Sequence, residues 1–287
     1  MSKLQALINR IIRFSAVDGP GNRLVIFLQG CNLQCINCHN PHTIGICNFC
    51  GKCIKECPVN ALEIIAGDPS WINYDESRCV NCDHCLEVCP INSNPRSRWM
   101  EVDEVIKEIH RVAPFISGIT VSGGEATQQL DFVKELFTCI KNDYKLSSLT
   151  NFIDSNGIAP ISYWETLLPV LDGAMIDLKA FDPDVHYQLT GETNDLVLAT
   201  IPYLYDKGKL YEVRLLIVPG YNDDREQIDA TADYLAKIGR DIRIRLIPFR
   251  KHGVRAKFRN LLEPEGELME EIKEIFVKDG FEEIYIT

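Results

Sequence analysis

Three cysteines near the N-terminus have the spacing of metal ligands. Cys31, Cys35 and Cys38 form a C-x3-C-x2-C motif directly after the apolar run 24–28. Thiolates this close in sequence can bind three corners of one iron–sulfur cluster. No fourth cysteine lies in the same stretch, so one iron of a cubane cluster here would stay open to a small molecule.

Eight further cysteines form an internal repeat. Residues 47–60 and 79–92 both carry the pattern C-x2-C-x2-C-x3-C-P. The repeat resembles a bacterial two-cluster ferredoxin, in which the fourth cysteine of each run ligates the other cluster. A pair of zinc sites is the alternative, although zinc motifs rarely use this spacing. The resemblance implies one 4Fe-4S cluster on Cys47, Cys50, Cys53 and Cys89, and a second on Cys57, Cys79, Cys82 and Cys85.

Composition limits the classes of function. The chain has 287 residues, and its formal net charge of -11 argues against nucleic acid or an anionic membrane surface as the main partner. Residues 1–14 lack the apolar core of a signal peptide, and no run approaches the length of a membrane span. We therefore expect a cytoplasmic protein, whose twelve cysteines bind metal rather than form disulfides. Cys139, outside the two motifs, fits a small buried apolar side chain.

Helices and strands alternate along most of the chain, which predicts parallel strands joined by right-handed crossovers. Six strand–helix units are too few to close an eight-stranded barrel, so an open partial barrel and a doubly wound sheet remain. In both, active residues lie at the C-terminal ends of the strands. We expect strands at 24–28, 118–121, 146–150, 174–178, 210–218 and 242–247, and helices at 101–112, 126–141, 161–171, 196–205, 225–238 and 267–277.

Short motifs at the predicted strand ends carry a family resemblance. They are D-G-P-G at 18–21, C-H-N-P at 38–41, S-G-G-E at 122–125, D-S-N-G at 154–157, D-L-K at 177–179, and Arg214 followed by V-P-G at 218–220. Alone, each could be a turn or a solvated charge pair. In this order they resemble the radical S-adenosylmethionine (SAM) superfamily and, within it, the activating enzymes of glycyl radical enzymes. The resemblance implies an α/β partial (β/α)6 barrel of radical SAM type, residues 1–45 and 97–287, interrupted by a ferredoxin-like domain at 46–96.

The resemblance also implies a reaction. SAM would bind the open iron, and one electron would release methionine and a 5′-deoxyadenosyl radical. The radical would take a hydrogen atom from a glycine of a partner glycyl radical enzyme. Reduced flavodoxin or ferredoxin would supply the electron, and the protein would act as a monomer. The implied catalytic residues are Asp18, Cys31, Cys35, Cys38 and Lys179.

The same resemblance assigns cofactor contacts. The S-G-G-E segment would meet the amino group of SAM, and Asp18 with Arg214 would hold the incoming glycyl loop. Asp154, Ser155 and Met175 would form a monovalent cation site beside the carboxylate of SAM. The implied cofactor-binding residues are Asn37, Cys38, His39, Ser122, Gly123, Gly124, Glu125, Asp154, Ser155, Asn156, Met175, Asp177, Leu178, Lys179, Arg214 and Arg250.

Two positions depart from the family pattern. Asn37 stands where relatives often carry an aromatic residue beside the adenine, which implies an adenine contact from the backbone here. Arg250 stands where relatives often carry a histidine that touches the ribose, and His252 lies two positions further on.

Two other functions compete with an activating enzyme. A radical enzyme acting on a small molecule is disfavoured by the D-G-P-G segment and by the lack of a long C-terminal substrate domain. A ferredoxin-type electron carrier would leave Cys31, Cys35 and Cys38 without a role. The sequence does not identify the partner enzyme or the electron donor.

Overall fold

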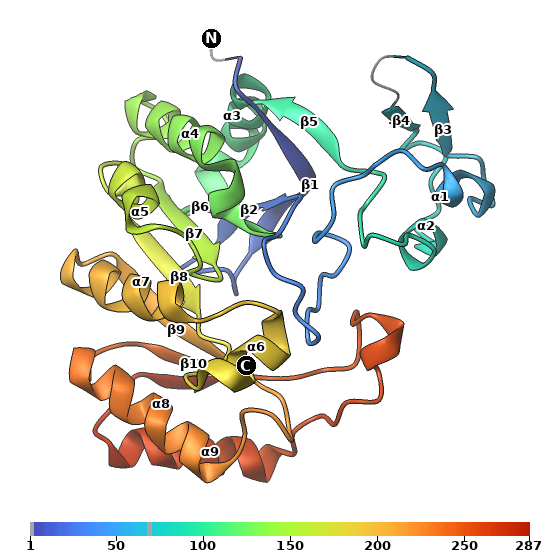
Figure 1. Cartoon of the computed structure of the whole chain (residues 1–287). Helices are drawn as coiled ribbons and strands as arrows, with labels where there is room; N and C mark the ends of the chain where they lie inside the picture. Colours follow the sequence, from blue (N-terminus) through green and yellow to red (C-terminus); the bar gives the residue numbers. More distant parts are fainter. Residues whose placement is uncertain (1–2, 68–70) are drawn as a thin grey trace.

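One large, mostly parallel sheet organises the protein (Figure 1). The computed structural model describes residues 3–67 and 71–287. Within them the sheet has nine strands in the order β11-β10-β9-β8-β7-β6-β2-β1-β5. The parallel strands are β2 (Arg23–Leu28), β6 (Gly118–Gly123), β7 (Thr150–Ser155), β8 (Gly173–Asp177), β9 (Leu210–Ile217), β10 (Ile244–Pro248) and β11 (Ile284–Ile286).

The helices cover one face of this curved sheet, and the segment after β2 lies on the other side (Figure 1). A doubly wound sheet would carry helices on both faces, so the open partial barrel is the better description. Apolar stripes bury these helices; on α3 the stripe is Val105, Ile109 and Val112. The helices are α3 (Val102–Val112), α4 (Leu130–Asn142), α5 (Ile161–Leu167), α6 (Pro183–Thr190), α7 (Asp195–Asp206), α8 (Arg225–Ile238) and α9 (Gly266–Lys278). The predicted alternation is confirmed, most closely at α8.

The strand predicted at 146–150 is wrong. Residues 146–149 form a turn, in which Leu149 donates its backbone N–H to the Leu146 carbonyl at 2.8 Å, and β7 begins at Thr150. The apolar side chains of the turn are buried, which made it resemble a strand. The actual strand contains buried Asn151, whose amide donates to the carbonyls of Phe137 and Val170. The sequence pattern therefore missed the start of β7, because a polar residue lies at a buried position of this strand.

Two antiparallel strands at the sheet edge were not predicted. They are β1 (Gln5–Ser15), which pairs with β2, and β5 (Arg98–Glu101), which pairs with β1 and forms the edge of the sheet. β1 carries cations, but Ala6 and Ile8 join the core, while Arg10 lies over the Phe27 ring at 5.0 Å. The first half of β1, residues 6–9, is buried, and the exposed cations Arg10 and Arg13 lie in its second half.

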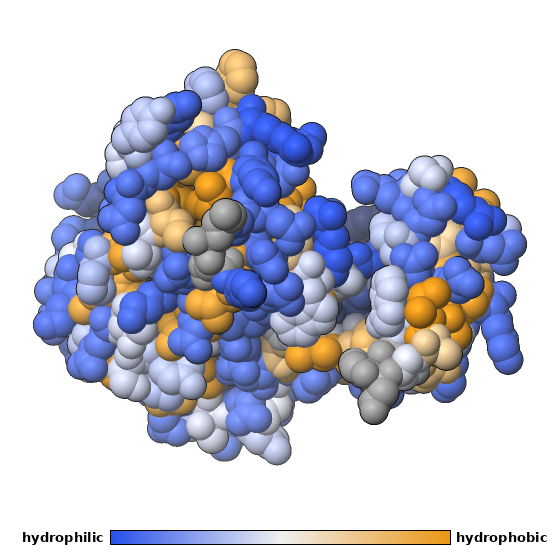
Figure 2. Space-filling model, turned by 90° about the horizontal axis from the view of Figure 1, so that it is seen from above, coloured by the Kyte–Doolittle hydropathy of each residue, from blue (hydrophilic) through white to orange (hydrophobic). Residues whose placement is uncertain are grey.

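Residues 46–96 form a small lobe at one side of the main body (Figures 1 and 2). Its strands β3 (Leu62–Ile65) and β4 (Trp71–Tyr74) make a separate antiparallel pair. Two single-turn helices, α1 (Lys52–Lys55) and α2 (His84–Glu87), pack together below it. An isolated bridge between Thr43 and Ser93 joins the lobe to the body.

None of the helices in the described ranges is both long enough and apolar enough to cross a membrane.

Candidate functional site

The three-cysteine segment, residues 30–40, lies at the C-terminal end of β2 and is called the cluster loop here. Its backbone is fixed near its start and near its middle. Cys31 donates its N–H to the Ile44 carbonyl at 3.0 Å, and Gln34 donates to the carbonyl of Thr190 at the end of α6, also at 3.0 Å. The loop is therefore a braced part of the body.

Two glycines allow the end of β6 to touch the cluster loop. A Cβ on Gly123 would lie 2.3 Å from the Leu28 nitrogen, and one on Gly124 would lie 2.1 Å from the Gly30 carbonyl oxygen. Gly123 also has a φ of 114°, which side chains rarely adopt. Gly123 thus allows close backbone packing against β2, and Gly124 allows it against the cluster loop.

Burial dominates the electrostatics of the three thiols. It raises the pKa of Cys31 and Cys38, and it raises the pKa of Cys35 to about 11 against the opposing charge of Lys179. Neutral thiols are therefore favoured when nothing is bound. Metal binding must displace these protons, because the thiolate is the ligand.

Asn37 presents a polar group with no protein partner. Its side chain is 1% exposed, and neither its amide nitrogen nor its amide oxygen makes a hydrogen bond among the described residues. A buried, unpaired amide is costly, so such a group usually meets a ligand or water. Close by, Arg255 donates Nη2 hydrogen bonds to the carbonyls of Gln34 and Cys35 at 2.6 and 2.7 Å.

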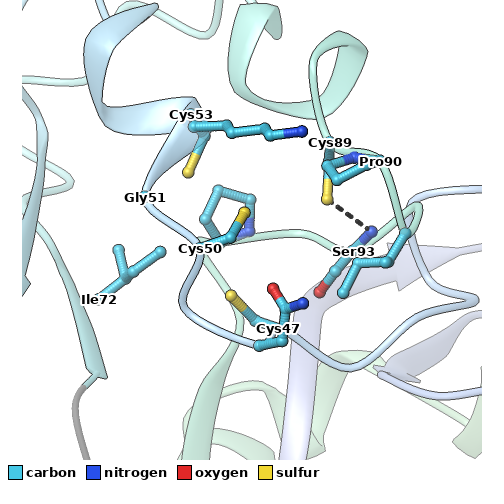
Figure 3. A pocket seen from close by; sticks show the side chains of 12 residues that line it. Cys47, Cys50, Gly51, Cys53, Ile72, Cys89, Pro90 and Ser93 are labelled. Atoms are coloured by element: carbon cyan, nitrogen blue, oxygen red, sulfur yellow. Dashed lines mark hydrogen bonds between the residues drawn. The ribbon is translucent and has the colours of Figure 1, made fainter.

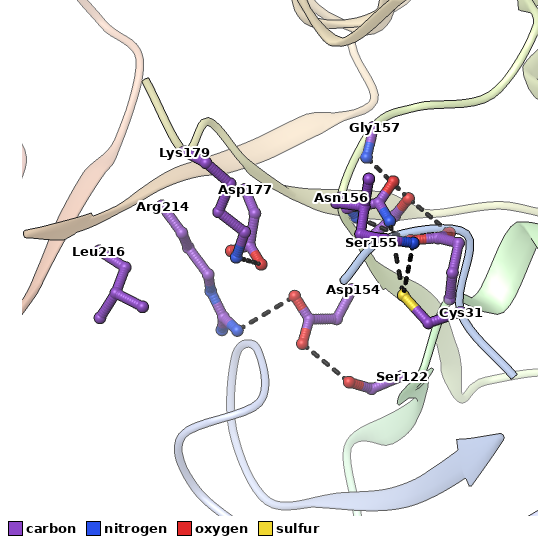
Figure 4. Close-up of polar contacts among 12 residues, drawn as sticks. Cys31, Ser122, Asp154, Ser155, Asn156, Gly157, Asp177, Lys179, Arg214 and Leu216 are labelled. Atoms are coloured by element: carbon purple, nitrogen blue, oxygen red, sulfur yellow. Dashed lines mark hydrogen bonds and ion pairs between the residues drawn. The ribbon is translucent and has the colours of Figure 1, made fainter. Parts of the chain in front are cut away.

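The predicted polar residues of four strands do meet at the C-terminal edge of the sheet (Figure 4). Ser122 of β6 donates to Asp154 of β7 at 2.8 Å. Asp177, the last residue of β8, pairs with Lys179 at 2.6 Å. Leu178 between them is buried and donates its N–H to the Arg214 carbonyl of β9.

A second group of charges lies deeper on β9 and β10. Arg214 pairs with Asp154 at 3.2 Å and with Glu212 at 2.9 Å, and Arg245 pairs with the same Glu212 oxygen at 2.8 Å. Burial raises the pKa of Asp154 to about 6, with Arg214 opposing it. Glu212 and Arg245 were not predicted. Glu212 and Arg214 are two positions apart, so they share one face of the strand. This spacing of opposite charges was the available sequence signal for the ion pair.

The D-G-P-G segment lies across the inner face of the sheet. The Asp18 carbonyl accepts a 2.6 Å hydrogen bond from Thr120, and the Asp18 carboxylate accepts one from Ser15. Fully buried Arg23, also not predicted, donates to the Pro20 carbonyl and stacks on Phe152 at 4.3 Å. The segment is therefore held by the body, and Asp18 is half-buried.

A separate network joins the S-G-G-E and D-S-N-G segments to the cluster loop. Buried Glu125 accepts hydrogen bonds from Ser155 Oγ and from the Asn156 N–H, both at 2.8 Å. The Asn156 amide donates to Asn32 at 2.8 Å and lies 4.0 Å from the Cys31 sulfur. Glu125 and Asn156 thus brace the loop.

Two predicted cofactor-binding residues, His39 and Arg250, differ in where their side chains lie. His39 stacks on Phe249, with ring centroids 5.9 Å apart, and its Nε2 accepts the Arg250 backbone N–H at 3.3 Å. The Arg250 guanidinium instead reaches the Thr287 carbonyl at 3.4 Å. The structure therefore brings the backbone of Arg250, but not its side chain, to the cluster loop.

The eight repeat cysteines line two separate cavities in the lobe. Figure 3 shows the first of them. The first contains Cys47, Cys50, Cys53 and Cys89, and the second contains Cys57, Cys79, Cys82 and Cys85. Each cavity thus takes three cysteines from one repeat and one from the other, the crossed grouping expected from the sequence.

The two repeats also have matching backbones. Cys47 and Cys79 each accept an N–H from the residue two positions on, at 3.4 Å. Cys57 and Cys89 each accept one from the residue four positions on, at 3.2 Å. The donors at the first pair of sites, Phe49 and Asn81, both have positive φ, near 58° and 54°. N–H groups aimed at sulfur favour the thiolate form.

Comparison with known proteins agrees with this geometry. The family model described as the Radical SAM superfamily matches residues 25–235. The chain belongs to the radical SAM superfamily. It is 30% identical to the indoleacetate decarboxylase activating enzyme of Tractidigestivibacter scatoligenes over 276 residues, 88% of this chain and 85% of the relative. It is 31% identical over 256 residues to the pyruvate formate-lyase-activating enzyme of Streptococcus mutans, 88% of this chain and 80% of the relative. The resemblance to activating enzymes is thereby confirmed.

A solved structure shares the fold. QueE from Escherichia coli aligns with a TM-score of 0.54, covering 99% of this chain and 94% of that one. The sequence identity is 12%, so the likeness concerns the fold alone.

Proposed function

We propose that this protein is an activating enzyme that installs a radical on a glycine of a partner glycyl radical enzyme. The observation that carries the proposal is a braced three-cysteine loop beside four polar strand ends, in a radical SAM chain related to activating enzymes. A 4Fe-4S cluster on the loop would supply the electron that splits SAM into methionine and a 5′-deoxyadenosyl radical. That radical takes the glycine hydrogen and becomes 5′-deoxyadenosine.

The cluster loop fits a cluster with one open iron. Eight of the twelve cysteines line the two lobe cavities and Cys139 lies on α4, which leaves three for the loop. Cys31, Cys35 and Cys38 would ligate three irons, and the fourth would take the amino and carboxylate groups of SAM. Cys35 is buried, and Cys31 and Cys38 are half-buried, which limits the access of water to a radical formed there.

Asn37 fits the nucleoside part of the cofactor. Its unpaired amide offers one donor and one acceptor, the combination that matches an adenine edge. We therefore assign the adenine contact to the side chain of Asn37, in addition to the backbone contact that the family resemblance implies. Ser122, Asp177 and Lys179 would hold the methionine end, and Asp18 would face the incoming glycyl loop.

The lobe fits two further clusters. Each cavity offers four cysteines, which would complete the ligand set of a 4Fe-4S cluster and leave no iron open. We propose a ferredoxin-like domain at residues 46–96, inserted into a radical SAM domain formed by residues 1–45 and 97–287. Its clusters would pass electrons or support the fold without binding SAM.

The remaining parts of the proposal follow from the class of enzyme. Reduced flavodoxin or ferredoxin would be the donor, and the protein would work in the cytoplasm as a monomer, where its unpaired cysteines stay reduced. The curated relatives are named for different partners, among them indoleacetate decarboxylase and pyruvate formate-lyase. We therefore propose the class of partner rather than one enzyme.

The test is anaerobic incubation of the reconstituted, reduced protein with SAM and candidate glycyl radical enzymes. Electron paramagnetic resonance should show a glycyl radical doublet on one candidate, together with 5′-deoxyadenosine. The Cys35→Ala variant should give neither. A different result would favour a radical enzyme that acts on a small molecule. In that case 5′-deoxyadenosine would form while a small molecule is consumed, and no candidate protein would carry a radical.

A further inference from the structure

The groups expected to hold a monovalent cation already have protein partners. Asp154 accepts from Ser122 and pairs with Arg214, and Ser155 Oγ donates to Glu125. The sulfur of Met175 accepts an N–H from Arg214 at 2.9 Å. One guanidinium thus contacts two of the three candidate ligands, as Figure 4 shows for Asp154.

The guanidinium of Arg214 is fixed in this position. Besides Asp154 and Met175, it donates Nε to Glu212 at 2.9 Å and Nη2 to the Val17 carbonyl at 3.2 Å. Arg214 is 8% exposed, and Glu212 is fully buried. A rotation away from the site would break a buried ion pair, which is strongly unfavourable.

The charges around Arg214 are paired without any metal. Lys179 faces Asp177 at 2.6 Å, Arg214 faces Asp154 at 3.2 Å, and Arg245 faces Glu212 at 2.8 Å. A metal ion between Asp154 and Met175 would be an extra positive charge beside a buried guanidinium. Repulsion in this poorly solvated interior disfavours that arrangement.

We infer that Arg214 is itself the cation of this site, so that the protein binds SAM without a monovalent metal ion. The inference rests on the proposed function. A guanidinium has five N–H donors, and the four contacts above leave capacity for a ligand carboxylate. Arg214 would thus neutralise Asp154 and offer its remaining N–H to the carboxylate of SAM.

The experiment measures SAM affinity of the reconstituted protein by calorimetry, in buffers whose only cation is K⁺, Na⁺ or bulky choline. The wild-type dissociation constant should agree within about twofold across the three buffers. Arg214→Ala should bind at least about tenfold more weakly in choline, as expected for losing a hydrogen bond from a charged group. K⁺ or guanidinium ions should restore much of that affinity.

Arg245→Ala is the matched control. It also removes a cation from Glu212 but touches neither Asp154 nor Met175, so it should gain no cation dependence. Wild-type binding that requires K⁺ or Na⁺ overturns the inference, as does an Arg214→Ala protein that no cation restores. If Arg214→Ala does not fold, the comparison of wild-type SAM affinity across the three buffers tests the inference without the variant. Absence of SAM binding in every buffer would instead refute the proposed function.

Discussion

The protein presents its cysteines in two contrasting ways. The cluster loop offers three thiols, of which Cys35 is buried and Cys31 and Cys38 are half-buried. The loop is braced by α6, β6 and Arg255. The lobe offers eight thiols in two cavities of four, and Cys50 and Cys82 are exposed. A set of four can complete a cluster, whereas a set of three leaves a reactive position. Under the proposed function, the cluster loop and the lobe sites would all bind iron–sulfur clusters. They would differ in the number of cysteine ligands, three at the loop and four at each lobe cavity.

The surroundings of the two regions reinforce this contrast. Around the cluster loop the described residues supply an unpaired Asn37 amide and polar strand ends at Ser122, Asp154 and Asp177. Each lobe cavity is instead lined by four cysteines, together with apolar residues such as Ile72 and charged residues such as Lys52 and Arg96. The difference that supports the two proposed roles is therefore the number of cysteines at each site.

Replacement of a loop cysteine should have the largest effect. Cys35→Ala should abolish formation of 5′-deoxyadenosine, because the open-iron cluster cannot assemble. Bound iron should fall from about twelve to about eight per chain, the content of two cubanes. Iron analysis and chromatography of the products measure both quantities, and Cys139→Ala on α4 is the control. An unchanged iron content would remove the assigned role of the loop.

Replacement of a lobe cysteine should have a different effect. Cys53→Ala should also lower bound iron, by about four per chain. It should leave the response of the loop cluster to SAM intact, because that cluster uses no lobe cysteine. Electron paramagnetic resonance of the reduced variant, with and without SAM, measures this response. Loss of the response while the loop cluster remains would contradict the division of roles.

Asn37→Leu should weaken SAM binding by about 10- to 100-fold, the range for losing two hydrogen bonds at a buried site. A SAM analogue with oxygen in place of the adenine amino group should bind wild type less tightly than SAM. The variant should discriminate less between the two ligands. Binding titrations test this, and Asn142→Leu, at an exposed position on α4, is the control. Equal discrimination by variant and wild type would exclude the amide contact.

Arg255→Ala should have the smallest effect. It removes two hydrogen bonds to carbonyls of the cluster loop, which corresponds to about 1–2 kcal/mol of the free energy of unfolding. The loop cluster should then lose iron to a chelator faster than wild type, while iron loss from the lobe is unchanged. Arg259→Ala, an exposed neighbour, is the control. Faster iron loss from the lobe as well would indicate general destabilisation.

Sequence patterns predicted the parts of the molecule in which pattern and chemistry coincide. The crossed grouping of Cys57 with Cys79, Cys82 and Cys85 followed from the resemblance of the repeat to a two-cluster ferredoxin, in which the fourth cysteine of each run joins the other cluster. The meeting of Ser122, Asp154 and Asp177 followed from parallel strands, whose carboxyl ends share one edge.

The remaining parts depend on tertiary contacts that no local pattern records. β7 was misplaced because Asn151 and Asp154 are polar strand residues whose partners come from distant segments. Arg23 and Arg255 bind backbone carbonyls far away in the chain, and a carbonyl carries no sequence signal. The Arg214 contacts with Met175 and Asp154 likewise join three strands, so only the structure revealed that these two expected cation ligands already have a protein partner.

The central claim is that SAM binds at the three-cysteine loop and not in the lobe. Electron–nuclear double resonance on the reduced protein, with SAM labelled by ¹⁵N at its amino group, tests it most directly. The account predicts a nitrogen coupling to a reduced cluster in wild type and in Cys53→Ala, and none in Cys35→Ala. A coupling that survives in Cys35→Ala, or is absent from wild type with all three clusters present, would contradict it.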